Sequence, residues 1–133
     1  MTLYEVIEQI LPDIKTMPQI HAMWLEGSWA TGYNNEHSDT DVWLDVEDET
    51  FSQCIDTFRD ALLEVGTIDW EKSRGVYSTD PKLQKHTFHL TNFPEEQVIE
   101  LDLQEHGRNF IFDKKEHVIK VLFDRDGSIK WAE

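Results

Sequence analysis

Two aspartates in the first half of the chain have a spacing that suits metal-dependent phosphate chemistry. Asp39 and Asp41 are two residues apart where an apolar strand begins, and alternate residues of a strand point to the same face. Two carboxylates held side by side raise the pKa of one of them unless a cation compensates their charge. The spacing therefore predicts a site for a divalent cation, and hard carboxylate oxygens suit Mg²⁺.

A glycine and a serine end the apolar stretch that precedes these aspartates. Residues 20–25 are mainly apolar and are followed by Glu26, Gly27 and Ser28. Gly27 has no Cβ, so backbone N–H groups can approach a phosphate closely at this turn. A short helix opening at Ser28 would add its first amides to the same anion site.

A third carboxylate is predicted on a later strand. In the segment 99–103, Ile99, Leu101 and Leu103 form an apolar face and leave Glu100 and Asp102 on the opposite one. This phase matches that of the strand at 41–46, where the acids also alternate with apolar residues. We therefore expect Asp102 to meet Asp39 and Asp41 across neighbouring strands and to share one or two Mg²⁺ ions with them.

The order of these residues resembles that of the nucleotidyltransferase superfamily of DNA polymerase β type. The matching features are Gly27-Ser28, the Asp-x-Asp pair at 39 and 41 in an apolar strand, and the later Asp102 flanked by apolar residues. The closest resemblance is to the small bacterial members, the minimal nucleotidyltransferases and the antibiotic adenylyltransferases. It covers residues 20–103.

The resemblance implies transfer of a nucleoside monophosphate, AMP from ATP, to a hydroxyl group with release of pyrophosphate. Gly27 and Ser28 would hold the triphosphate. Asp39 and Asp41 would bind two Mg²⁺ ions. Asp102 would complete the metal site and accept the proton of the attacking hydroxyl.

The sequence differs from this family in the residue after Gly-Ser and in the expected source of the acceptor site. Many small members carry a basic residue directly after Gly-Ser, but this chain has Trp29, so we expect the triphosphate contacts to come from Lys72 or Arg74. The antibiotic-modifying members have a second, helical domain that shapes the acceptor pocket. We therefore expect the acceptor site to come from a second subunit, a helical partner protein or a shallow cleft.

The resemblance leaves more than one acceptor open, and it leaves open whether the protein is active. An aminoglycoside-like antibiotic and a protein hydroxyl are both compatible with the resemblance, and an acidic cleft would attract a polycation. A different reading is a catalytically weak or inactive binding module that keeps the fold and acts through a partner protein. A third is an acidic structural domain without a site.

Two helices are predicted to support these residues. The first begins at Thr2, which forms a capping box with Glu5, and apolar residues follow at helical spacing until Pro12 ends or kinks it. The second runs from Thr50 to a stop at Gly66.

Strand-like stretches fill the rest of the chain. The helices and strands in this order predict an α+β fold, a mixed sheet with helices packed on one face, in one domain covering residues 1–133. The last two strands are expected to form a hairpin through a turn at 124–127. The expected strands are 20–25, 41–46, 67–70, 86–90, 98–103, 118–123 and 128–131.

Composition narrows the class of protein and its partners. The chain has 27 Asp and Glu against 12 Lys and Arg, a formal charge of −15, yet 39% of its residues are hydrophobic and 11% aromatic, which favours a folded core over an acidic disordered segment. The charge disfavours direct binding to nucleic acid or anionic membranes. Cys54 is the one cysteine, and no apolar run is long enough for a membrane span, so we expect a cytoplasmic protein.

Overall fold

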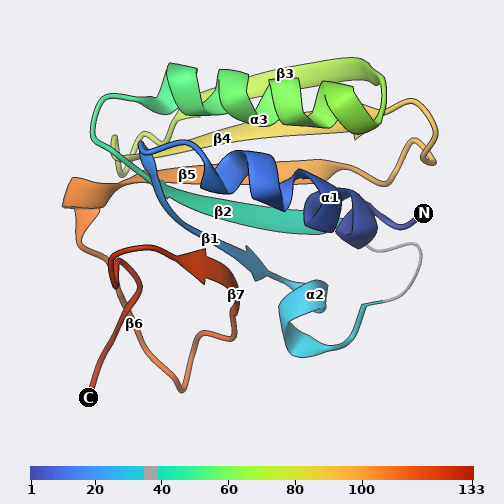
Figure 1. Cartoon of the computed structure of the whole chain (residues 1–133). Helices are drawn as coiled ribbons and strands as arrows, with labels where there is room; N and C mark the ends of the chain where they lie inside the picture. The colour runs from blue at the N-terminus through green and yellow to red at the C-terminus, as the bar shows by residue number, and fades with distance from the viewer. Residues whose placement is uncertain (35–38) are drawn as a thin grey trace.

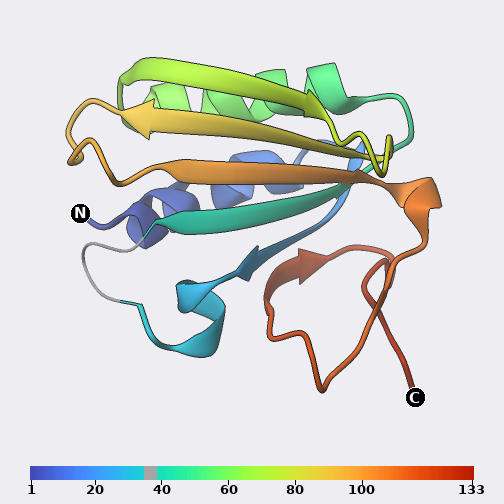
Figure 2. The same ribbon diagram turned by 180° about the vertical axis from the view of Figure 1, so that it is seen from behind.

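The computed structural model describes residues 1–34 and 39–133 and contains two layers. One layer is a six-stranded mixed sheet, and the other is a pair of long helices, α1 (Leu3–Lys15) and α3 (Phe51–Val65), which cover the same face of the sheet (Figure 1). Seen from behind, the opposite face carries no long helix over its central strands (Figure 2). The predicted α+β class with helices on one face is confirmed.

The strand order places two strands that are far apart in the sequence, β2 (Thr40–Val46) and β5 (Ile99–Glu105), side by side at the centre of the sheet. The order is β3-β4-β5-β2-β1-β7; β2 and β5 run parallel, and the other neighbouring strands of this sheet are antiparallel. A short helix, α2 (Ser28–Thr31), follows β1 directly. The six strands are β1 (Ile20–Glu26), β2 (Thr40–Val46), β3 (Ile68–Val76), β4 (Leu83–Leu90), β5 (Ile99–Glu105) and β7 (Lys120–Asp124).

Helix α1 begins as predicted but ends later. The Thr2 hydroxyl accepts the Glu5 N–H (3.2 Å), and the Glu5 carboxylate accepts the Thr2 N–H (2.9 Å), which completes the capping box. Pro12 is expected to end or kink the helix, and the first of these alternatives is wrong, since α1 continues to Lys15. Ile10 and Ile14, one on each side of the proline, are buried, and their packing holds the last turn despite the missing backbone donor.

Helix α3 occupies the predicted span, but its first residue is held differently. The Thr50 side chain makes no cap bond to the helix; its hydroxyl donates to the backbone oxygen of Glu47 (2.6 Å). Cys54 is fully buried on the apolar stripe, and burial raises the pKa of its thiol. The thiol therefore stays protonated and behaves as a small apolar side chain.

The core explains why the acids face away from the helices. Val42, Leu44, Leu101 and Leu103 are fully buried in one cluster with the apolar faces of α1 and α3. Because side chains alternate along a strand, the residues between them project toward the opposite side of the sheet. We call this side, which the long helices leave uncovered, the open face.

The C-terminal strands do not form the expected hairpin. Strand β7 pairs with β1, whereas β8 (Lys130–Trp131) pairs in parallel with β6 (Ile111–Phe112) in a separate two-stranded sheet. The Asp124 carboxylate accepts the backbone N–H groups of Ser128 (2.7 Å) and Ile129 (3.0 Å). These bonds turn the chain away from β7, so the two last strands lie in different sheets.

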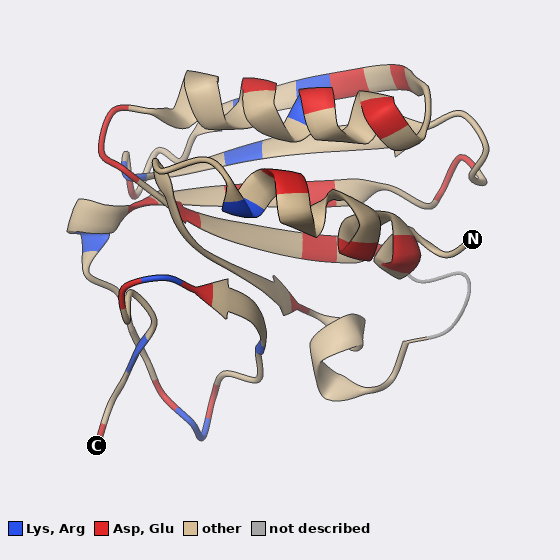
Figure 3. Cartoon of the chain, in the orientation of Figure 1, with Lys and Arg blue, Asp and Glu red and all other residues tan. Residues whose placement is uncertain are grey.

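The negative charge is not confined to one element. Figure 3 shows acidic residues on both long helices, on the strands and in the C-terminal loops. Within residues 1–34 and 39–133, no helix has both the length and the apolar character needed to cross a membrane.

Candidate active site

Strand pairing assembles a row of acids across the open face. The parallel register of β2 and β5 sets Asp41 beside Glu100 and Trp43 beside Asp102. The antiparallel register of β1 and β2 sets Glu26 beside Asp41. Directly paired residues of adjacent strands project from the same face, so Glu26, Asp41 and Glu100 form one row and Asp102 lies in the next.

Asp41 lies directly beneath the turn that follows β1. Gly27 has φ +72° and ψ −149°, a conformation that is nearly exclusive to glycine. A Cβ built on Gly27 would overlap Oδ2 of Asp41, so the absent side chain is what lets the turn approach this carboxylate. The Gly-Ser turn and the second aspartate of the pair are thus brought together, with α2 opening at Ser28 as expected.

The charge of Asp41 is poorly compensated. Burial, together with Glu100, Asp102 and Asp39, raises the pKa of Asp41 to about 6, and Lys85 opposes this shift. Among the described residues, no side chain or backbone group donates a hydrogen bond to its carboxylate. A cation or a proton at this position would therefore be favourable.

The neighbouring acids have protein partners. The Asp39 carboxylate accepts the backbone N–H of Val98 (2.8 Å), and Oδ1 of Asp102 accepts the Tyr77 hydroxyl (2.9 Å). Burial raises the pKa of Asp102, and the bond from Tyr77 opposes this shift. These two acids are therefore oriented by the fold.

Glu100 is held by groups from β4. It accepts the Thr87 hydroxyl (3.2 Å) and forms an ion pair with Lys85 (3.3 Å). Lys85 is thus a cation in direct contact with the acidic row. It lies opposite Asp102 in the β4–β5 register.

The predicted site residues are partly brought together. Asp41 and Asp102 project from the open face of neighbouring strands, as expected, and Gly27 contacts the Asp41 position. Asp39 precedes β2, so it is not the strand residue the spacing suggested, and its carboxylate anchors the segment before β5. It nevertheless contributes to the raised pKa of Asp41.

Two acids at this site, Glu26 and Glu100, had no role in the sequence-based prediction. Glu100 alternates with apolar residues in the same phase as Asp102, but phase does not tell which of the two lies beside Asp41. Glu26 directly precedes Gly27 in the sequence. Its proximity to Asp41 depends on the β1–β2 register, which the sequence pattern does not determine.

The donor chemistry of the row suits a hard cation, although the protein alone does not surround one. Within residues 1–34 and 39–133, no group of three or more His, Cys, Asp or Glu side chains is arranged to hold a metal ion. Mg²⁺ is commonly held by only one or two carboxylates, with water and substrate phosphates as its other ligands. The unpartnered Asp41 carboxylate can act as one such ligand. Positively charged side chains that contact an incoming phosphate must come from outside this row of acids.

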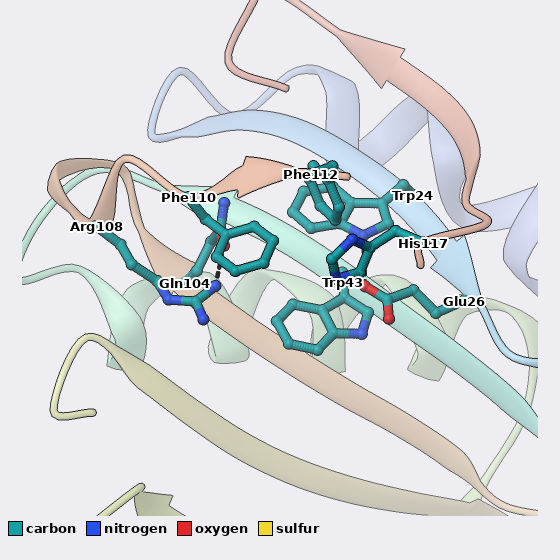
Figure 4. Close-up of a pocket in the computed structure, with 8 residues that line it drawn as sticks. All are labelled: Trp24, Glu26, Trp43, Gln104, Arg108, Phe110, Phe112 and His117. Atoms are coloured by element: carbon teal, nitrogen blue, oxygen red, sulfur yellow. Dashed lines mark hydrogen bonds between the residues drawn. The ribbon is translucent and has the colours of Figure 1, made fainter. Parts of the chain in front are cut away.

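Two hollows flank the acids on the open face. One lies at the end of the sheet formed by β3 and β4, and two positively charged side chains line it next to Glu100. The other lies over β1 and β2 and is mostly aromatic, with the C-terminal segment forming part of its wall (Figure 4). The first hollow is lined by Arg74, Val76, Tyr77, Ser78, Thr79, Lys85 and Glu100.

Comparisons with known proteins find similarity among solved structures. No family model matches the chain, and no curated protein matches its sequence. Among solved structures, the chain is similar to the poly(A) polymerase complex GLD-2–GLD-3, with a TM-score of 0.40 and 17% identity. The likeness covers 77% of this chain and 31% of that one, so the chain spans about a third of the length of the protein it matches.

Proposed function

We propose that this protein is a Mg²⁺-dependent nucleotidyltransferase that moves a nucleoside monophosphate, AMP from ATP, to a hydroxyl acceptor. The observation that carries the proposal is the Asp41 carboxylate, which lies under the Gly27 turn with its pKa raised to about 6 and with Glu100 and Asp102 on the adjacent strand. The order and spacing of these residues resemble those of the superfamily, and the strand register supports their convergence.

In this proposal Gly27 and Ser28 hold the triphosphate. Asp41 would bind Mg²⁺, with Asp39 and Asp102 as neighbouring carboxylates and with water and the phosphates as its other ligands. When bound, Mg²⁺ would screen the triphosphate charge and stabilise the leaving pyrophosphate. The acceptor oxygen attacks the α-phosphorus, and the bond from that phosphorus to the bridging oxygen of the β-phosphate breaks. The hydroxyl proton passes to Asp102.

The second oxygen of Asp102 is the atom suited to this proton. Oδ1 already accepts the Tyr77 hydroxyl, whereas Oδ2 has no hydrogen bond within the described part of the chain. The raised pKa of Asp102, caused first by burial, makes its carboxylate a better proton acceptor than an exposed aspartate.

The cations of the β3–β4 hollow are suited to the phosphates. Arg74 and Lys85 both line this hollow. Lys72 is paired with Thr87, which places it on the open face in the same row as Glu100. We assign the triphosphate contacts to Arg74 and Lys85, with Lys72 at the outer end of the row.

Calorimetry with ATP tests the proposal directly. The intact protein should bind ATP in the presence of Mg²⁺ and lose most of that affinity when EDTA is added or when Asp41 is replaced by Ala. The matched control is Asp60→Asn, because Asp60 is an exposed acid of α3. If the intact protein binds no nucleoside triphosphate, the proposal is wrong.

An inactive binding module that keeps the fold and acts through a partner protein is the alternative. The two readings separate in an assay for pyrophosphate release. A module that acts only through a partner binds ATP without releasing pyrophosphate, whatever acceptor is supplied.

A further inference from the structure

The aromatic hollow beside the acids is a partly open cavity whose walls are packed aromatic rings. Trp24 of β1 stacks on Trp43 of β2 (ring centroids 5.8 Å apart) and meets Phe112 edge-on (5.7 Å). Phe110 packs edge-on against Phe112 (4.9 Å). Figure 4 shows the Trp43 and Phe110 rings on different sides of the space, with the Glu26 carboxylate at one end.

Glu26 supplies the negative charge of this cavity. Its Oε2 accepts the indole N–H of Trp24 (3.0 Å), and its Oε1 has no hydrogen bond within the described residues. Burial raises the pKa of Glu26, and Asp102 acts in the same direction. A bound cation would offset both effects.

The cations and amides around the cavity are already engaged. Arg108 donates to Asp80 (2.9 Å) and Gln104 (2.8 Å) and lies over the Phe110 ring. The side-chain amide of Gln104 donates in turn to a buried carboxylate of β2, that of Asp45 (2.9 Å). These bonds leave Glu26 as the charged group with a free oxygen at the cavity.

A histidine, His117, also lines this cavity. The backbone N–H of Asp113 donates to Nδ1 of His117 (2.9 Å). Nδ1 of His117 also lies 3.2 Å from the backbone oxygen of Asp113, and His117 and Arg108 both oppose the rise in the pKa of Glu26 without cancelling it.

The size of the cavity limits what it can hold. Its volume is about 130 Å³, close to the 150 Å³ or so of an engineered protein cavity that accepts benzene. A compact ammonium group with its methyl or methylene substituents fits within that space. Aromatic faces combined with a carboxylate are the features that recognise such a cation.

We propose that this cavity binds an alkylammonium head group between Trp43 and Phe110, with Glu26 as its counter-ion. Because Trp43 is paired with Asp102 and Glu26 with Asp41, the cavity adjoins the acidic row. Resting on the proposed function, the hydroxyl acceptor is therefore an amino alcohol whose ammonium is held here while its hydroxyl reaches Asp102.

The binding claim can be tested without nucleotide or Mg²⁺. Choline and its uncharged isostere 3,3-dimethylbutan-1-ol are titrated separately at pH 8 into the full chain, and the indole N–H signals are followed by NMR. Choline should shift the Trp24 and Trp43 signals and bind at least tenfold more tightly than the alcohol. Equal affinities, or no shift with choline, overturn the cation site.

Variants locate the site. Trp43→Leu and Glu26→Gln should each weaken choline binding at least tenfold, whereas Trp70→Leu, at an exposed tryptophan of β3, should leave it unchanged. Circular dichroism checks that each variant is folded. If Glu26→Gln and Trp43→Leu bind choline as tightly as the parent while folded, the cavity is not the site.

A separate experiment tests whether an amino alcohol is the acceptor. Labelled ATP, Mg²⁺ and a panel of amino alcohols should give labelled products that the corresponding alcohols without nitrogen do not give. Choline binding without such transfer, in a protein that releases pyrophosphate with another acceptor, refutes the amino alcohol as acceptor and leaves the cation site standing. Loss of ATP binding alone instead refutes the proposed function, since the choline titration does not depend on it.

Discussion

Replacing Asp41 with Asn should stabilise the protein, and the gain should depend on pH. The pKa of this carboxyl is about 6 in the folded protein against an ordinary value of 3.8. Well below pH 3.8 the group is neutral in both the folded and the unfolded state, so it favours neither. As the pH rises through 6, folding must bury a charge, and the wild-type protein loses about 3 kcal/mol relative to low pH. Asn is neutral throughout and avoids this loss.

Urea unfolding followed by tryptophan fluorescence, with EDTA present, measures the effect. The free energy of unfolding of Asp41→Asn should exceed that of the wild type by about 3 kcal/mol at pH 8 and by less than about 1 kcal/mol at pH 4. The control Asp60→Asn should change it by no more than about 0.5 kcal/mol at either pH, as is usual for a surface substitution. A gap of equal size at both pH values, or no gap at pH 8, would refute the claim that Asp41 is a half-buried and poorly compensated charge.

Three further substitutions test other parts of the structure. Gly27→Ala should cost about 1–3 kcal/mol in urea unfolding, because the alanine must adopt a conformation nearly exclusive to glycine and displaces the Asp41 carboxylate; an unchanged midpoint would contradict the turn geometry. Tyr77→Phe removes the hydroxyl that donates to Asp102 and should shift the acidic limb of the pH–rate profile to higher pH, whereas superimposable profiles would mean that this bond has no role in proton transfer. Thr2→Ala breaks the capping box of α1 and should lower the free energy of unfolding by about 1 kcal/mol. An unchanged urea midpoint would show that the cap does not stabilise the protein.

Elements with a strong local pattern could be predicted from the sequence. The two long helices follow from apolar residues at helical spacing, and β2 follows from its strict alternation, so the face on which the acids of β2 and β5 lie could be derived. The end of α1 could not, because burial of Ile14 outweighs the local effect of Pro12. The pairing partners of the last two strands could not either, since they depend on contacts between distant segments.

The candidate site shows the same division between local pattern and register. Motif order identified Gly27, Asp41 and Asp102 as residues that belong together. Strand register decides that Glu100 is the direct neighbour of Asp41 and that Glu26 completes the row, and the sequence holds no local signal for either pairing.

The aromatic cavity lies beyond what the sequence pattern predicts. Its walls combine alternate residues of β1 and β2 with aromatic residues that follow β5, such as Phe110. That segment has no periodic pattern, and its packing against Trp24 and Trp43 appears only in three dimensions.

The central claim is tested most directly by following the two ends of the triphosphate. The protein is incubated with Mg²⁺ and an acceptor mixture that includes amino alcohols, once with ATP labelled on the α-phosphate and once with ATP labelled on the γ-phosphate. Nucleotidyl transfer predicts that the α-label enters a new product, that the γ-label leaves as pyrophosphate, and that Asp41→Ala abolishes both. Transfer of the γ-label to the acceptor, or no release of pyrophosphate by the intact protein, would contradict it.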